Sequence, residues 1–136
     1  MINFKRVITP MVLVALLVGG SLRTSAQNMS GTVVERRVKF AKGKTSVTLR
    51  GKARYAMSYV YHVRAQKGQH MSVQLKSARG LATFSLTAPD TQTVENAFGT
   101  KDWSGDLPQT GDYSIVLVMN EERGGSVPYV LAVTVK

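Results

Sequence analysis

The 136-residue sequence contains no cysteine, only two histidines and a single tryptophan. Without cysteine, the chain forms no disulfide bond and has no thiol to carry a lipoprotein's lipid anchor. Thiolate zinc sites are excluded as well, and no carboxylates cluster around the two histidines to complete a metal site. Beyond the N-terminal segment, no apolar run approaches the roughly 20 residues that a membrane-spanning helix needs. We therefore expect no metal, no cofactor and no stable membrane insertion of the mature chain.

No arrangement of residues indicates an enzyme. Ser58 and Ser72 neighbour the segments that carry the histidines, but no strained-turn motif presents either hydroxyl as a nucleophile. Asp102 and Asp106 are four residues apart, a spacing that any acid-rich loop would show. Gly124-Gly125 lacks the following lysine and hydroxyl residue of a phosphate-binding loop. The sequence therefore favours a binding protein over a catalyst.

The first 26 residues are typical of a secretory signal peptide. Lys5 and Arg6 precede an apolar run at 11–18, and small residues lead to a cleavage site after Ala26. The alternative, a membrane anchor, is disfavoured because the run is shorter than the roughly 20 residues that span a bilayer. We predict a signal peptide at 1–26, a flexible lead at 27–32 and one folded domain at 33–136, located in the periplasm or outside the cell.

The charge of the chain is strongly uneven. The sequence has 18 basic and 8 acidic side chains, and the part after residue 26 has 15 basic and 8 acidic ones. Residues 27–79 contain 12 of those basic residues and one acid, whereas residues 80–136 contain three basic residues and seven acids. This asymmetry predicts a basic face. For an exported protein, the partners that fit are an anionic envelope polymer or an acidic protein cleft, not nucleic acid; simple solubility is the other explanation.

Alternation of apolar and polar residues runs through the chain after residue 33 and predicts strands. The clearest segments are 58–64, 71–76, 82–87, 113–119 and 129–135, with weaker alternation at 34–40 and 45–49. The basic stretch 51–54 and the segment 91–101 are interpreted as loops. Seven or eight short strands joined by glycine-containing turns, without an amphipathic helix, predict an all-β fold: an antiparallel β-sandwich or jelly roll.

The segment 102–115 contains the most specific motif of the chain. Trp103 and Leu107 are expected to be buried and to close one end of the sandwich. Pro108 and Gly111 suit a turn between two strands. Tyr113 begins the following strand, where its ring can be buried while its hydroxyl bonds a loop backbone. Fold stability explains this motif without any binding role.

Three motifs together resemble the periplasmic inhibitors of g-type lysozyme. They are Phe40-x-Lys42-Gly43, Ala65-x-Lys67-Gly68-Gln69 and Leu107-Pro108-x-Thr110-Gly111-Asp112-Tyr113. The resemblance covers 38–136, and parts of it also occur in bacterial pre-peptidase C-terminal domains, which are β-sandwiches. It implies a β-sandwich that is not an enzyme and that blocks the active-site cleft of a lysozyme, g-type foremost, with loops carrying arginine and tyrosine.

Carried over to this sequence, the resemblance points to the loop 120–125 and to tyrosines between the second and third strands. The implied partner-binding residues are Asn120, Glu121, Glu122, Arg123, Tyr55 and Tyr59. Arg123 is the position that matches the arginines of the family, and an inserted arginine can pair with the catalytic glutamate of a lysozyme. A solvated loop charge is the alternative interpretation of Arg123.

A second interpretation assigns binding to the basic half of the domain. In it, the protein is a module for carbohydrate or for an anionic envelope polymer, and it uses Arg36, Arg37, Lys39, Lys42, Lys44, Arg50, Lys52 and Arg54. Inhibition predicts a tight complex that depends on the loop 120–125. Polymer binding predicts weak, salt-sensitive retention that depends on the basic residues. The sequence indicates no oligomeric state.

Overall fold

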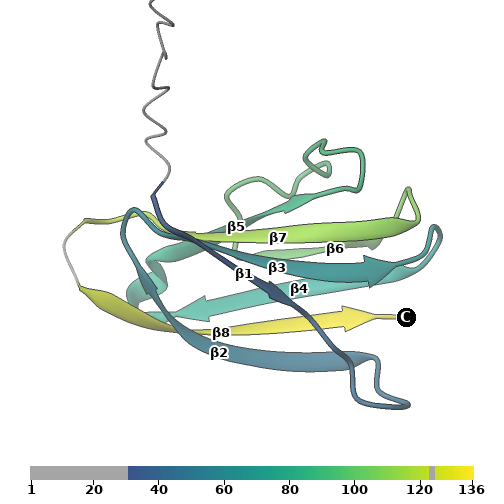
Figure 1. Cartoon of the computed structure of the whole chain (residues 1–136), viewed down its shortest axis with the longest axis horizontal. Coiled ribbons are helices and arrows are strands. Elements are labelled where there is room, and N and C mark those ends of the chain that lie inside the picture. The colour runs from purple at the N-terminus through teal and green to yellow at the C-terminus, as the bar shows by residue number, and fades with distance from the viewer. Residues whose placement is uncertain (1–30, 123–124) are drawn as a thin grey trace, which may run out of the picture.

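The computed structural model describes residues 31–122 and 125–136, so the expected signal peptide and residues 27–30 of the expected lead lie outside the described residues. The described chain forms eight strands and one 3₁₀ turn (Figure 1). The elements are β1 Val33–Arg37, β2 Ser46–Arg54, β3 Ser58–Ala65, β4 His70–Ser77, η1 Ala78–Gly80, β5 Ala82–Thr87, β6 Asp102–Asp106, β7 Gly111–Met119 and β8 Ser126–Val135. In this part of the chain, no helix has the length and hydropathy to cross a bilayer.

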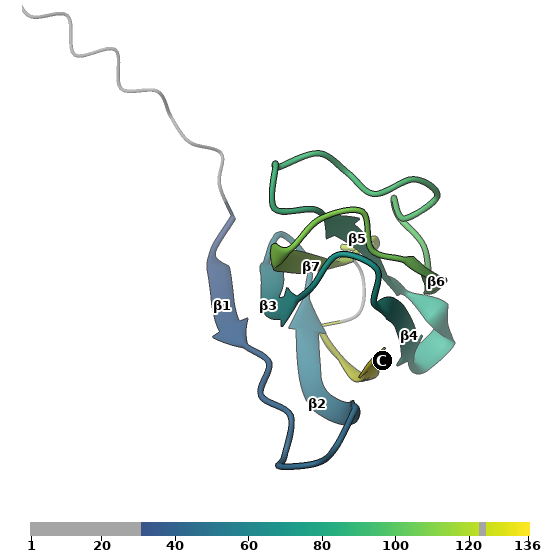
Figure 2. The same ribbon diagram turned by 90° about the vertical axis from the view of Figure 1, so that its right-hand side faces the viewer.

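The strands form two four-stranded sheets, in the orders β1-β3-β7-β5 and β2-β8-β4-β6. Figure 2, a view from one end, shows them as two layers, with β1 and β2 toward one side and β6 on the other. This arrangement confirms the predicted all-β sandwich. One pairing differs from the antiparallel expectation, because β1 runs parallel to β3, with Val34 opposite Tyr59. Local alternation identifies a strand but not the direction of its partner.

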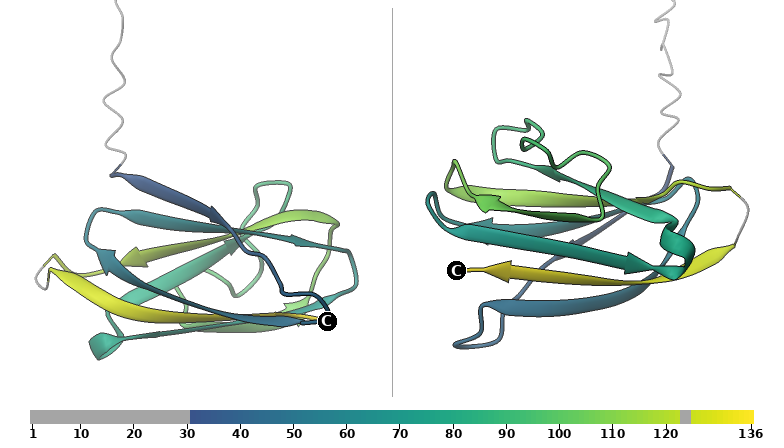
Figure 3. Two further views of the ribbon diagram at one scale, coloured as in Figure 1. Left: turned by 60° about the horizontal axis from the view of Figure 1, so that its bottom comes forward. Right: turned by 180° about the vertical axis from the view of Figure 1, so that it is seen from behind.

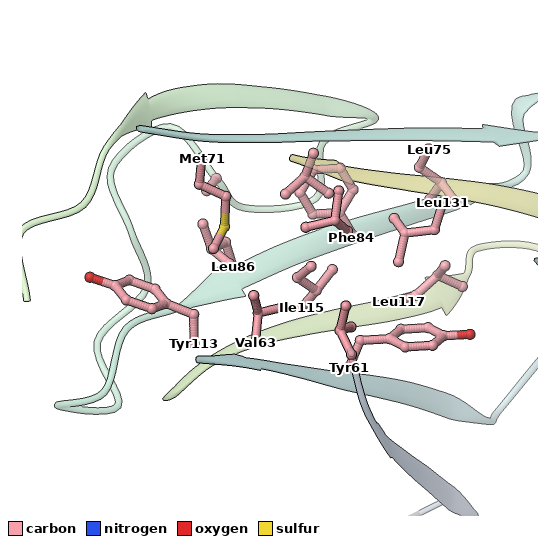
Figure 4. Close-up of a cluster of buried hydrophobic side chains, with 14 of the residues drawn as sticks. Tyr61, Val63, Met71, Leu75, Phe84, Leu86, Tyr113, Ile115, Leu117 and Leu131 are labelled. Carbon is pink, nitrogen blue, oxygen red and sulfur yellow. The ribbon is translucent and has the colours of Figure 1, made fainter. Parts of the chain in front are cut away.

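The core lies between the two sheets and is built from the apolar positions of the alternating strands (Figure 4). Phe84, Ile115, Leu117 and Leu131 are fully buried there. On β7 the burial alternates at every residue, as expected for a strand with one face in the core. Removing a large side chain from such a position lowers the free energy of unfolding by about 2–5 kcal/mol. These residues therefore hold in place the strands whose connections form the candidate site.

Tyr113 forms the buried corner that the sequence predicts. Its side chain is 0% exposed. Its hydroxyl donates to the Gln109 carbonyl over 2.7 Å and accepts from the Gln109 backbone N–H over 3.0 Å. The phenol thereby fastens the turn 108–112 to the start of β7. Both backbone groups of Gln109 are satisfied by one buried side chain.

The interpretation of 51–54 as a loop is wrong, because β2 continues through Arg54. Gly51 lies opposite Tyr129 of β8, and a Cβ at Gly51 would come within 2.6 Å of the Tyr129 hydroxyl. The glycine therefore makes room for a ring from the neighbouring strand instead of breaking the strand. Ala53 is buried while Lys52 and Arg54 are exposed, so the alternation of a strand persists through the basic stretch.

The expected position of Trp103 also needs correction. The residue lies on the edge strand β6 opposite Val73, not at an end of the sandwich, and it is only half-buried against the core. Its Nε1–H donates to the Glu95 carbonyl over 3.0 Å. Leu107 is buried, at 2% exposure, as expected. Because Trp103 keeps part of its ring in water, its replacement costs less free energy than that of a fully buried aromatic.

Candidate functional site

One end of the sandwich combines the β2–β3 turn, residues 55–57, with the β7–β8 connection, residues 120–125. The register places the bases of these two connections side by side, since Ser58 lies opposite Val118 and Arg54 lies opposite Ser126. Both panels of Figure 3 show this end on the side of the domain away from the C-terminus. We call it the loop end. The opposite end, with residues 66–69 and 107–112, is called the corner end because Tyr113 closes it.

The β2–β3 turn presents one tyrosine and is held by another. Ala56 adopts a left-handed conformation, with φ 62°, which reverses the chain within three residues. Tyr55 precedes it and is 47% exposed. The Tyr59 hydroxyl accepts from the Arg54 backbone N–H over 3.2 Å and contacts the Met57 sulfur over 3.7 Å. Tyr59 therefore holds the turn in shape, and the turn presents the side chain of Tyr55 to solvent.

The β7–β8 connection is fastened at its start by Asn120. The Asn120 backbone N–H donates to the Leu81 carbonyl over 3.0 Å, and its side-chain amide donates to the Thr83 hydroxyl over 3.1 Å. Glu121 and Glu122 follow and are exposed. Arg123, the main candidate from the sequence, and Gly124 lie outside the described residues. Gly125 has φ 60°, a value that favours glycine.

Three tyrosines pack between the sheets behind the β2–β3 turn. The rings of Tyr59 and Tyr129 lie 6.1 Å apart at a tilted angle. The hydroxyls of Tyr61 and Tyr129 hydrogen-bond to each other, and both side chains are buried. Burial, with a contribution from this bond, raises the pKa of Tyr129 above its usual value. Of the two tyrosines expected to bind a partner, Tyr59 is therefore partly buried against the core, whereas Tyr55 is exposed.

The eight basic residues of the polymer interpretation are exposed but fall into two groups. Arg36 and Arg37 belong to β1, and Lys39, Lys42 and Lys44 to the β1–β2 connection, whereas Arg50, Lys52 and Arg54 belong to β2.

Arg37 is the member of this set that is held by an ion pair. Its guanidinium donates two hydrogen bonds to Asp112 over 3.1 and 2.9 Å. This contact lowers the pKa of the Asp112 carboxyl and raises the pKa of Arg37. The pair joins the parallel edge strand β1 to the start of β7, so Arg37 is a structural contact and not a free cation.

A chain of hydrogen bonds that the sequence did not indicate links β4 to β6. His70 Nδ1 lies 2.9 Å from Asp106, and its Nε2 lies 2.8 Å from the Ser104 hydroxyl. The order serine, histidine, aspartate is that of a nucleophilic triad, but such a triad needs a buried acid to orient the imidazole. Here the side chains of Asp106 and His70 are 83% and 53% exposed. We interpret the chain as a surface link between strands.

No three His, Asp or Glu side chains among the described residues come together as a metal site. The loop end is the candidate site for a protein partner. Its frame consists of the Tyr59 and Asn120 contacts, and its accessible groups among residues 31–122 and 125–136 include Tyr55, Glu121 and Glu122.

No family model matches the chain, and no curated protein matches it. Among solved structures, the chain is similar to PliG of Aeromonas hydrophila, a periplasmic lysozyme inhibitor of g-type lysozyme, with 30% identity and a TM-score of 0.67 over 77% of this chain and 98% of that chain. PliG of Salmonella Typhimurium is 23% identical, with a TM-score of 0.56 over 76% of this chain and 98% of that chain.

A third similar structure is the pre-peptidase C-terminal domain of a collagenase from Bacillus anthracis. It is 13% identical, with a TM-score of 0.52 over 76% of this chain and 94% of that domain, and this likeness shows the fold alone. The fold is a β-sandwich of the kind seen in this pre-peptidase C-terminal domain and in the periplasmic lysozyme inhibitors. The 30% identity over nearly all of the Aeromonas protein shows the narrower group: the chain belongs to the PliG family. The resemblance predicted from the sequence motifs is confirmed.

Proposed function

We propose that this protein inhibits a g-type lysozyme in the periplasm, by placing its loop end in the active-site cleft of the enzyme. The observation that carries the proposal is the 30% identity to Aeromonas PliG across 98% of that chain. That relative is described as a periplasmic inhibitor of g-type lysozyme. The expected signal peptide at 1–26 agrees with export to the same compartment.

The geometry of the loop end supports this mode of binding. Tyr55 is exposed on a short turn whose backbone is held by the hydrogen bond from the Arg54 N–H to the Tyr59 hydroxyl, so the turn has less freedom to lose on binding. Tyrosine and arginine are enriched among the residues that dominate binding energy in protein interfaces. In this proposal Tyr55 and Arg123 make the contacts with the enzyme, while Tyr59 and Asn120 hold the two connections in position.

Arg123 is the residue proposed to meet the catalytic carboxylate. A guanidinium can form two parallel hydrogen bonds with a carboxylate, a geometry that lysine does not reproduce. Glu121 and Glu122 precede it and would remain at the rim of the cleft, in water. The role of such a protein is occupation of the cleft without turnover, so we propose a binding protein and not an enzyme.

The test is an inhibition assay with the chain starting at Gln27 against g-type, c-type and i-type lysozymes in parallel. Arg123→Ala should weaken inhibition of the g-type enzyme at least tenfold, about 1.4 kcal/mol. Arg123→Lys should recover part of that loss, because it restores the charge but not the planar fork. The matched control is Lys42→Ala, which removes one exposed cation at the corner end and should leave inhibition unchanged.

Two outcomes would contradict the proposal. Failure of the parent to inhibit the g-type enzyme would remove lysozyme inhibition as the function. Equal inhibition by the parent and both Arg123 variants would place the inhibitory contact outside the β7–β8 connection, while leaving the assignment to the family intact.

A further inference from the structure

The outer face of the β2-β8-β4-β6 sheet carries a groove that lysozyme inhibition does not use. It has a volume of about 580 Å³ and runs over three neighbouring strands. Its cations are Arg50 and Lys52 of β2 and Lys76 of β4, and its apolar floor includes Pro128 and Val130 of β8. Among the described residues of the loop end, neither the turn 55–57 nor residues 120–122 and 125 line it.

The register arranges these residues in rows across the strands. Val130 lies opposite Arg50 on one side and opposite Lys76 on the other, so one row reads cation, apolar residue, cation. Adjacent strands are about 4.8 Å apart, which puts the two flanking backbones roughly 10 Å from each other. In the next row Lys52 lies opposite Pro128. The groove therefore offers two cations on the β2 side of an apolar strip and one cation on the β4 side.

The three cations are not neutralised within the described residues. The ion pairs found among residues 31–122 and 125–136 involve Arg37, His62 and His70 and none of the groove cations. Within their bounds, β2, β4 and β8 contain no aspartate or glutamate at all. Cations that share a groove and lack internal counter-ions concentrate anions from solution.

The ligand must combine repeated negative charge with an apolar surface. The floor of the groove lies over β8, whose backbone pairs with β2 on one side and with β4 on the other, so a peptide lying in the groove would find no free strand edge beneath it. The groove is also open to water along its length, which does not suit an acyl chain. A sugar ring, in contrast, has an apolar C–H face and can carry a carboxylate or phosphate.

We propose that this groove binds a linear anionic glycan, with sugar rings resting on Val130 and Pro128 and acidic groups held by Arg50, Lys52 and Lys76. The site is independent of the proposed inhibition. Of the eight basic residues that the sequence suggested for polymer binding, the groove contains Arg50 and Lys52. It also contains Lys76, which the sequence did not single out.

The experiment measures binding of four probes to the chain starting at Gln27 by calorimetry at physiological salt. The probes are an oligogalacturonate, a phosphorylated oligosaccharide, a neutral oligosaccharide of the same length and polyglutamate. We expect the oligogalacturonate, the phosphorylated oligosaccharide or both to bind, and their relative affinities show whether the groove prefers carboxylate or phosphate. The neutral oligosaccharide and polyglutamate should bind markedly more weakly. Binding of polyglutamate as tight as that of the charged glycans would overturn the proposal.

Variants separate the groove from general positive charge. The triple variant Arg50→Gln, Lys52→Gln, Lys76→Gln should weaken glycan binding at least tenfold. The control triple Lys39→Gln, Lys42→Gln, Lys44→Gln removes the same charge from the β1–β2 connection and should change binding less than threefold. Val130→Ser should weaken it about threefold by removing the apolar floor. Equal losses in the two triple variants, or full binding by Val130→Ser, would contradict the assignment.

Discussion

The two ends of this sandwich differ in how their connections are held. At the corner end, the Tyr113 hydroxyl binds both backbone groups of Gln109, and the Leu107 N–H and carbonyl bond Gln69 and Gly68 of the neighbouring turn. A further bond joins the Lys67 N–H to the Thr110 hydroxyl over 2.9 Å. Two distant turns are thereby locked into one unit.

Among the residues that the structure describes, the contacts of the loop end lie at the bases of its connections. Asn120 bonds to Leu81 and Thr83, and Tyr59 bonds to the β2–β3 turn, but the exposed Tyr55 makes no hydrogen bond among the described residues. The corner end joins its turns to one another, whereas the loop end, which we propose to meet the partner, presents exposed side chains from a fixed base.

The largest expected difference between the ends is in stability. Tyr113→Ala removes a fully buried ring and should lower the free energy of unfolding by about 3–5 kcal/mol. Tyr55→Ala removes an exposed ring and should stay within about 0.5 kcal/mol of the parent. Urea denaturation of both variants measures the contrast. Similar losses in the two would mean that the loop end also stabilises the fold.

A smaller effect is expected from Tyr129, which lies beneath the β2–β3 turn. Tyr129→Phe removes the hydroxyl that bonds Tyr61 and should cost about 1 kcal/mol. Its pKa is raised in the folded state, so folding favours the protonated phenol. The resulting stability is present below the unfolded pKa of about 10 and is lost as the pH rises through the folded value.

The check is a comparison of unfolding free energies at pH 8 and at pH 11. The parent should lose more stability between these values than Tyr129→Phe does. A parallel decline of the two proteins would show that the Tyr129 hydroxyl is not responsible for the alkaline loss.

The smallest expected change in stability comes from Asn120. Asn120→Ala deletes the side-chain bond to Thr83 but keeps the backbone bond to Leu81, so the loss should be about 0.5 kcal/mol. Inhibition should fall several-fold, because the base of the β7–β8 connection becomes looser. Thr83→Ala removes the other partner of the same bond and should reproduce both effects. If the two variants differ in stability or in inhibition, the effect of Asn120→Ala does not come from the bond to Thr83.

Alternation in the sequence predicted the central strands well. The inward residues of β3, β4, β5, β7 and β8 are those that their patterns indicated, because a strand with one face in a core must alternate. The sequence also predicted the corner formed by Tyr113, since its motif combines turn residues with an aromatic at the start of a strand.

Contacts between distant segments were not predictable in the same way. The parallel pairing of β1 with β3 depends on residues about 25 positions apart. From the sequence Gly51 suggests a loop, and only the structure shows that the Tyr129 ring of the neighbouring strand occupies the space beside it. The link from His70 to Ser104 and Asp106 spans 34 and 36 residues. Local spacing contains no signal for such pairings. Of the partner-binding residues expected from the sequence, Tyr55 and 120–122 are exposed, whereas Tyr59 is partly buried against the core, and their role in binding stays a prediction.

The most direct test of the division between the two ends is an NMR titration of the isotope-labelled chain, starting at Gln27, with an inactive g-type lysozyme. We predict that the largest amide shift changes fall at 54–58 and 120–125, with little change at 66–69 and 107–113. Shift changes concentrated at the corner end would contradict the account, because they would place the partner on the turns that Tyr113 locks together.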